Sequence, residues 1–157
     1  MTVVNAREFE INLSAHVERL GERADQFVQG FCQTLFSEIH SGGRYSPGTP
    51  VDTGFARASW YAGVGGPGSA RGLAEPTARS PGLLASEAAA ALADLDEVSL
   101  HAKAGDVVEL ANDARYIGVL ENGSSQQAPQ GMVRLAILAG QQIADEVAAH
   151  VMGQRAA

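Results

Sequence analysis

The strongest pattern in the chain is a stripe of large apolar residues near its start. They recur at steps of three and four, as Val17, Leu20, Ala24, Phe27, Val28, Phe31, Leu35 and Ile39. This spacing is typical of one face of an α-helix. Ser14 fits a helix N-cap, and Gly42 and Gly43 follow the last apolar residue. The pattern therefore predicts a helix of about seven turns from Ser14 to His40.

The opposite face of this helix is polar, with Glu18, Arg19, Glu22, Arg23 and Gln26. Such a face is either solvated or a contact surface, and the pattern alone favours neither. The other expected elements are strands at 9–13, 58–64, 98–102 and 107–111, a helix at 83–95 and a second long helix at about 129–152. The strands at 98–102 and 107–111 are expected to form a hairpin around the turn at 104–106. This order predicts an α+β fold in which two long helices, N-terminal and C-terminal, pack a small antiparallel sheet.

Residues 62–82 contain nine Gly or Pro residues in 21 positions. A segment this long without regular structure is either a functional arm or a disordered loop. The length of 157 residues suits one domain with its own core. We therefore expect a single domain over 1–157 that carries a flexible arm at 62–82.

Charge and hydropathy exclude several classes of protein. The net charge is −7, and the 11 basic residues form no cluster, whereas binding to a nucleic-acid backbone requires clustered Lys and Arg. The first seven residues do not resemble a signal peptide, and no segment is long and apolar enough to span a membrane. The sequence thus predicts folding in the cytoplasm, with the single Cys32 as a buried thiol.

Patterns associated with catalysis are weak. Residues 63–68 have the glycine spacing of a dinucleotide-binding turn, but Pro67, Pro76 and Pro81 interrupt the helix that should follow. The four histidines have no metal-ligand spacing, and the acidic pairs lie at a helix end. We predict no catalytic, cofactor-binding or metal-binding residue. The alternative hypothesis is a small-molecule-binding or hydrolytic domain that uses the Gly-rich loop 63–68.

Two segments together point to a known family. Residues 49–60, TPVDTGFARASW, resemble the signature TPVDTG-x-x-R-x-S/N-W of the tail-component family of long-tailed bacteriophages, which includes tail-completion and neck proteins similar to minor tail protein Z. Further on, Tyr116 and then residues 120–134, LENGSSQQAPQGMVR, are similar to the second block of that family. Phe55 and Ala56 depart from the usual pattern after the glycine, so Arg57 is the matched residue there.

The first block also has a physical interpretation. Pro50 fixes its own φ, Asp52 can accept backbone hydrogen bonds, and Gly54 allows a positive φ. These residues predict a rigid turn that delivers Arg57 and Trp60 into a strand. Trp60 is then either a core residue or a direct subunit contact. Similarly, Glu121 and Arg134 form either an ordinary surface ion pair or an intersubunit contact.

The resemblance implies a structural protein of the virion and no enzyme. Copies would form a ring at the neck, where the tail meets the head, and DNA would pass through without sequence-specific binding. The implied partners are further copies of the chain, a tail-terminator or tail-tube protein, and head-completion or connector proteins, with no membrane and no cofactor. Tail completion, tail termination and head–tail connection all remain possible roles. The residues expected to serve assembly are Pro50, Asp52, Gly54, Arg57, Trp60, Tyr116, Glu121 and Arg134.

Overall fold

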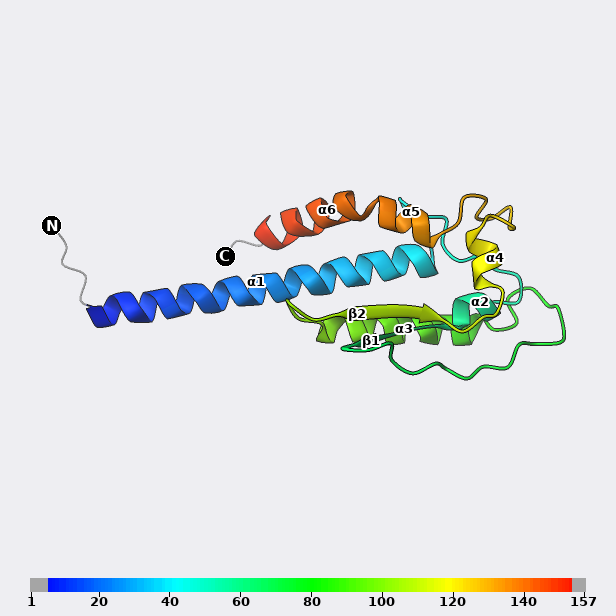
Figure 1. The fold of residues 1–157 in the computed structure, drawn as a ribbon, viewed down its shortest axis with the longest axis horizontal. Helices are drawn as coiled ribbons and strands as arrows, with labels where there is room; N and C mark the ends of the chain where they lie inside the picture. The colour runs from blue at the N-terminus through cyan, green and yellow to red at the C-terminus, as the bar shows by residue number, and fades with distance from the viewer. Residues whose placement is uncertain (1–5, 154–157) are drawn as a thin grey trace.

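The computed structural model describes residues 6–153 (Figure 1). The elements in chain order are α1 (Ala6–His40), α2 (Phe55–Ala58), β1 (Trp60–Val64), α3 (Ala85–His101), β2 (Val108–Asn112), α4 (Ile117–Glu121), α5 (Val133–Leu138) and α6 (Gly140–Gly153). The two strands form one antiparallel sheet. The predicted mixture of helices with a small antiparallel sheet is therefore correct.

Helix α1 is the axis of the molecule, and it is longer than its sequence pattern indicates. It begins at Ala6, so the strand predicted at 9–13 is wrong. An alternation over only three apolar residues is a weak signal, and no Gly or Pro separates this segment from the helix that follows. Helix propagation adds one hydrogen bond per residue, so the longer periodic pattern extends through it. The helix ends as expected, with Gly42 at a φ of 83°.

The sheet joins segments that are far apart in the chain. β1 pairs with β2 in a register that sets Trp60 opposite Asn112 and Val64 opposite Val108. The hairpin predicted between 98–102 and 107–111 is wrong, because residues 98–101 are the last turn of α3. Leu95 and Ser99 are both fully buried, four residues apart on one helix face, and the Ser99 hydroxyl donates to the Leu95 carbonyl. Packing of this face extends the helix beyond Leu95.

The C-terminal part forms two helices where the sequence predicts one. The first begins at Val133, and a change of direction at Ala139, with φ −83° and ψ 0°, separates α5 from α6. Gly140 follows immediately, and glycine is a poor helix former. Helix α6 then packs along α1, where Val147 lies against Gly30. Because of this break, α5 and α6 run in different directions along the body (Figure 1).

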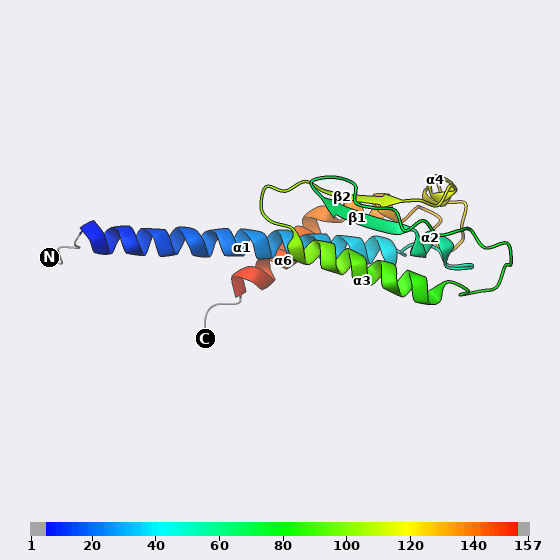
Figure 2. The same ribbon diagram turned by 90° about the horizontal axis from the view of Figure 1, so that it is seen from below.

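The main core lies between α1, α3, β1 and α5. Its buried residues are Cys32, Phe36, Ile39, Trp60, Leu95, Met132 and Ala136. Cys32 is a buried thiol, as predicted, and burial raises its pKa. Within residues 6–153, no helix is both long and apolar enough to cross a membrane. All the core residues of α1 belong to its C-terminal half, so its N-terminal half extends past the body (Figure 2).

Candidate assembly site

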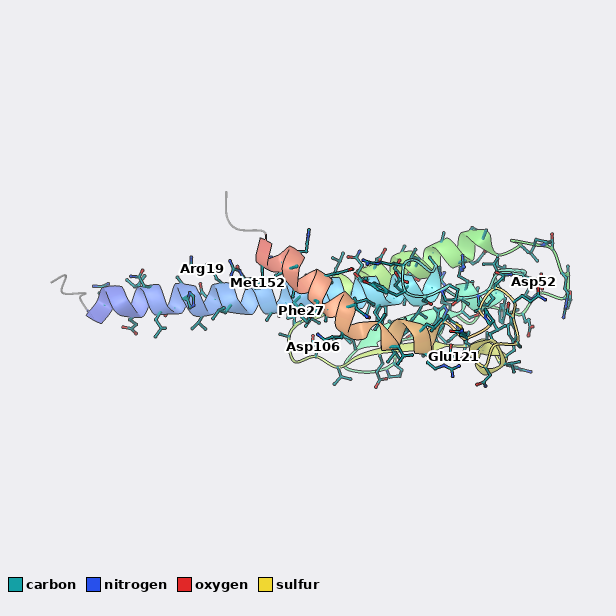
Figure 3. All side chains as sticks on the ribbon, turned by 90° about the horizontal axis from the view of Figure 1, so that it is seen from above. Arg19, Phe27, Asp52, Asp106, Glu121 and Met152 are labelled. Atoms are coloured by element: carbon teal, nitrogen blue, oxygen red, sulfur yellow. The ribbon has the colours of Figure 1, made fainter. Side chains whose placement is uncertain are left out.

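The two signature blocks lie together at the end of the molecule opposite the N-terminus of α1. Figure 3 shows Asp52 of the first block and Glu121 of the second at this end. They are joined directly, because the Gln127 side chain forms two hydrogen bonds with the Val51 backbone. Val51 N–H donates to Gln127 Oε1 and Gln127 Nε2 donates to the Val51 carbonyl, both at 2.9 Å. We call residues 49–60 and 116–134 together the motif junction.

Thr49 is the centre of the first block. Its side chain is fully buried, at 0% exposure. Its hydroxyl donates to the Ile39 carbonyl at 2.8 Å and accepts from Trp60 Nε1 at 2.8 Å, while its carbonyl accepts from Arg57 Nη2 at 2.7 Å. One residue thus ties the end of α1 to both Arg57 and Trp60. Thr49 was not among the predicted site residues, although it opens the first block.

The turn of the first block has the predicted backbone conformation. Gly54 has a φ of 92°, and a Cβ there would lie 3.3 Å from the Leu84 carbonyl group. The side-chain acceptor at this turn is Thr53 and not Asp52 as predicted, since Thr53 Oγ1 accepts from Phe55 N–H at 3.3 Å. Asp52 is exposed. Pro50, by contrast, is buried, so the turn combines a fixed interior with an exposed carboxylate.

Arg57 and Trp60 do not lie in the same element. Arg57 lies on the single-turn helix α2, so the prediction that the turn delivers it into a strand is wrong, while Trp60 begins β1. The Thr53 side chain accepts a hydrogen bond from Phe55 N–H at the start of α2, so the turn leads first into a helix and only then into β1. Trp60 is 4% exposed and belongs to the core. Its burial favours the interpretation as a core residue over that as a direct subunit contact.

A second buried polar group accompanies Arg57. His40 is 2% exposed, and its Nδ1 lies 2.8 Å from Ser41 Oγ. Burial lowers the pKa of His40 to about 4, and the positive charge of Arg57 contributes to this lowering. Burial likewise lowers the pKa of Arg57. His40 is therefore neutral at physiological pH, beside a guanidinium held by the Thr49 carbonyl.

The sequence predicts either a surface ion pair or an intersubunit contact for Glu121, and within one copy of the chain its carboxylate binds backbone N–H groups. Its Oε2 accepts from the backbone N–H groups of Met132 and Val133, and its Oε1 accepts from that of Arg134, all at 2.9 Å. These N–H groups at the start of α5 have no carbonyl partner within the helix, so Glu121 caps that helix. Partial burial would raise the pKa of Glu121, but the three N–H donors and the Arg134 charge together lower it. The Arg134 guanidinium instead donates to the Glu121 carbonyl at 3.2 Å.

A second glutamate supports the junction from α1, and sequence reasoning missed it. Glu38 is buried, and its carboxylate accepts from the N–H groups of Arg44, Tyr45 and Ser46 at 2.9–3.0 Å. The Ser46 hydroxyl in turn donates to the Met132 carbonyl at 3.0 Å. The loop between α1 and the first block is therefore attached to the second block. A glutamate followed six to eight residues later by a Gly-rich loop carries little sequence signal.

A cleft of about 390 Å³ opens at the motif junction. Its walls come from both blocks and from the arm, and include Asp52, Tyr116, Gln127, Glu75 and Arg79. The Tyr116 ring lies 6.3 Å from that of Phe55, and burial, with the nearby Glu75 charge, raises the pKa of Tyr116. The cleft thus presents two carboxylates, one guanidinium and one side-chain amide. Among residues 6–153, no group of His, Cys, Asp and Glu could hold a metal ion.

The Gly-rich loop 63–68 lies away from this cleft. It turns back beside the sheet, where Gly65 N–H donates to the Val107 carbonyl at 2.8 Å. The next helix, α3, begins only at Ala85. No helix N-terminus therefore follows the loop directly, as a pyrophosphate-binding turn would require.

The chain was compared with known protein families, with curated proteins and with solved structures, and none of the three comparisons finds a match.

Proposed function

We propose that this chain is a structural protein of a long-tailed bacteriophage that completes the tail at the neck and joins tail to head. Copies form a ring around the DNA channel. They contact a tail-terminator or tail-tube protein on one side and head-completion or connector proteins on the other. In this proposal the chain is not an enzyme and needs no cofactor. It is made in the cytoplasm of the host bacterium and ends in the virion.

One observation supports this proposal most directly. Two segments that resemble the family pattern are separated by more than fifty residues, yet Gln127 and Val51 join them through paired hydrogen bonds. Two segments that resembled the pattern by chance would not be expected to contact each other in the folded chain. The buried residues Thr49 and Trp60 and the cap Glu121 hold the junction rigid.

The residues expected to serve assembly then fall into two groups. Five of them shape the junction from within, namely Pro50, Gly54, Arg57, Trp60 and Glu121. Asp52 and Arg134 are exposed on it, and Tyr116 lines the cleft. We assign direct contact with other virion proteins to this second group. A charge pair that becomes buried between subunits contributes more to specificity than an exposed pair does.

The test is complementation of a phage that lacks the gene. We expect the null phage to give DNA-filled heads and separate tails, visible by electron microscopy, and the parent gene to restore infectivity. Gln127→Ala should reduce infectivity, because it removes both bonds to Val51. Gln126→Ala is the matched control, since Gln126 is a neighbouring, exposed glutamine that takes no part in the bonds to Val51.

Two outcomes would contradict the proposal. Full infectivity of the null phage would exclude a role in the virion. A hydrolytic or ligand-binding activity that depended on residues 63–68 would support the alternative hypothesis of a small-molecule domain.

A further inference from the structure

The N-terminal half of α1 extends well beyond the other elements (Figures 1 and 2). Residues 10–23 are exposed around the whole circumference of the helix. Figure 3 places Arg19 on this part and Phe27 nearer the body. We call residues 10–23 the projecting helix. Residues 6–153 place none of their other elements over the projecting helix, so any cover must come from outside these residues.

The projecting helix carries an uncovered apolar stripe. Leu13, Val17 and Leu20 are 50%, 59% and 52% exposed, and lie within about 60° of one another around the helix. The same line continues to Ala24, Phe27 and Phe31, so the steps are four, three, four, three and four residues. The average step of 3.6 residues is the period of an α-helix, so all six residues lie on one face of α1. An exposed apolar face of this kind indicates a binding partner.

The flanks of the stripe carry opposite charges. On one side, about 60–130° from the centre of the stripe, lie His16, Arg19 and Arg23. On the other side, about 50–140° from the centre, lie Glu10 and Glu18. The projecting helix thus has a basic flank and an acidic flank, with apolar residues between them.

This distribution of charge distinguishes between two ways of pairing a helix with its own copy. A two-fold rotation that makes the helices antiparallel sets like flanks side by side, so basic faces basic and acidic faces acidic. A parallel arrangement sets the basic flank of one copy against the acidic flank of the next. Like charges at this range repel and opposite charges attract. We propose that projecting helices of neighbouring copies pack in parallel through the Leu13–Val17–Leu20 stripe.

The area available also favours the parallel arrangement. One face of the projecting helix covers roughly 300 Å², well below the ~800 Å² per partner of a standard interface. Parallel helices bring the two bodies side by side, so body contacts add to the area. Antiparallel helices would place the bodies at opposite ends and leave the tips as the main contact.

A ring with cyclic symmetry also requires the parallel orientation. Rotation about one axis makes helices that run along the axis parallel, which is the orientation that the flanking charges favour. The inference rests on the proposed ring for the number of copies, whereas self-association itself can be measured on the purified chain.

The first experiment measures self-association of the full chain by sedimentation over a concentration series. The parent should assemble reversibly, and the triple variant Leu13→Glu, Val17→Glu, Leu20→Glu should weaken assembly at least about 100-fold, because each change removes apolar burial. Ile11→Glu is the matched control, since Ile11 is 61% exposed but lies on the opposite face of the same helix. Unchanged circular dichroism would show that the variants fold.

The second experiment tests the orientation by disulfide crosslinking. Leu13→Cys and Leu20→Cys, introduced singly, should each form a disulfide between copies, because parallel helices bring equal positions together. An antiparallel pair can align at most one of these positions, since the other would be about 20 Å away. The parent, whose only cysteine is the buried Cys32, is the control. Reversing the basic flank with Arg19→Glu and Arg23→Glu should weaken assembly, and adding Glu10→Arg and Glu18→Arg should restore it.

A parent that stays monomeric at all concentrations would overturn the inference, as would crosslinking at only one position. Assembly unaffected by the triple variant would also overturn it. Each of these results would leave the proposed virion role standing if the gene still complements the null phage. If the null phage stays infectious, the virion role is excluded, but the measured self-association is not affected.

Discussion

At the scale of single residues, buried polar groups hold the motif junction. The Thr49 hydroxyl forms hydrogen bonds with both the Ile39 carbonyl and Trp60 Nε1, and all three residues are buried. A buried donor or acceptor that loses its partner cannot turn to water, so its loss is costly. Thr49 therefore connects α1 to β1 by chemistry as well as by packing.

Thr49→Val keeps the shape of the side chain but leaves two buried groups unpaired. We expect it to lower the free energy of unfolding by about 2–4 kcal/mol. Thr49→Ser retains the hydroxyl and should cost less than half as much. Urea unfolding of the three proteins measures the difference. Equal destabilisation by Val and Ser would assign the effect to lost packing alone.

His40 predicts a dependence of stability on pH. Its pKa is about 4 in the folded protein, below the ordinary value of 6.5 that applies to the unfolded chain. Between these values the unfolded chain binds more protons, so stability falls as pH is lowered from about 6.5 towards 4. The loss attributable to His40 is up to about 3 kcal/mol. Urea unfolding at several pH values should show it.

His40→Gln is the comparison for this measurement, because glutamine does not titrate. The variant should lose most of the pH dependence above about pH 5. Below this value the lowered pKa of Glu121 also contributes, since its carboxylate becomes protonated more readily in the unfolded chain. A variant with the same slope as the parent in the higher range would show that another group titrates there.

At the scale of elements, one carboxylate determines where α5 begins. Glu121 accepts from three consecutive N–H groups at the start of that helix. Charged acceptors at a helix N-terminus gain from both hydrogen bonding and the helix dipole. Glu121 lies at the end of α4, so the same contact also fixes α4 relative to α5.

Glu121→Ala should lower the free energy of unfolding by about 2 kcal/mol, since it removes all three bonds. Glu121→Gln, which keeps one acceptor, should cost an intermediate amount. Arg134→Ala should stay within about 0.5 kcal/mol, because its side chain is exposed. Thermal unfolding of the set ranks them. A larger effect from Arg134→Ala than from Glu121→Ala would favour the ion-pair interpretation.

At the scale of the whole molecule, a body of packed elements lies between two contrasting extensions. The projecting helix leaves at one end, and the arm at 62–82 passes the motif junction at the other (Figure 1). Residues 62–64 of the arm belong to β1 and pair with β2. Beyond the strand, Gly65 N–H donates to the Val107 carbonyl and Gly82 N–H to the Asp52 carbonyl. Between these two points Arg71 forms an ion pair with Asp94, and Leu73 packs against the cluster around Phe55. The stretch between Arg71 and Gly82 is mostly exposed.

Limited trypsin digestion should therefore cut first after Arg79, which is exposed, rather than after Arg71, whose side chain is 22% exposed and ion-paired. Mass spectrometry of the first fragments identifies the site. Arg79→Gln should delay the first cut. A first cut within α1, at Arg19 or Arg23, would show that the projecting helix opens more readily than the arm.

Some of this structure could be predicted from local patterns alone. The periodic apolar residues of α1, the positive φ of Gly54 and the burial of Cys32 each depend on the residue and its near neighbours. The helical pattern from Val17 to Ile39 needs no distant partner to be recognised, and a glycine in a Pro-Val-Asp-Thr-Gly turn has few other conformations available.

The rest depended on contacts between distant segments. β2 pairs with β1 rather than with residues 98–102, because burial of Leu95 and Ser99 keeps residues 98–101 helical. Glu121 becomes a helix cap, and Thr49 a buried link, only once segments from different parts of the chain meet. A glutamate or threonine reads the same in sequence whether it is solvated or buried, because the free energy that assigns its role comes from the groups that replace water around it.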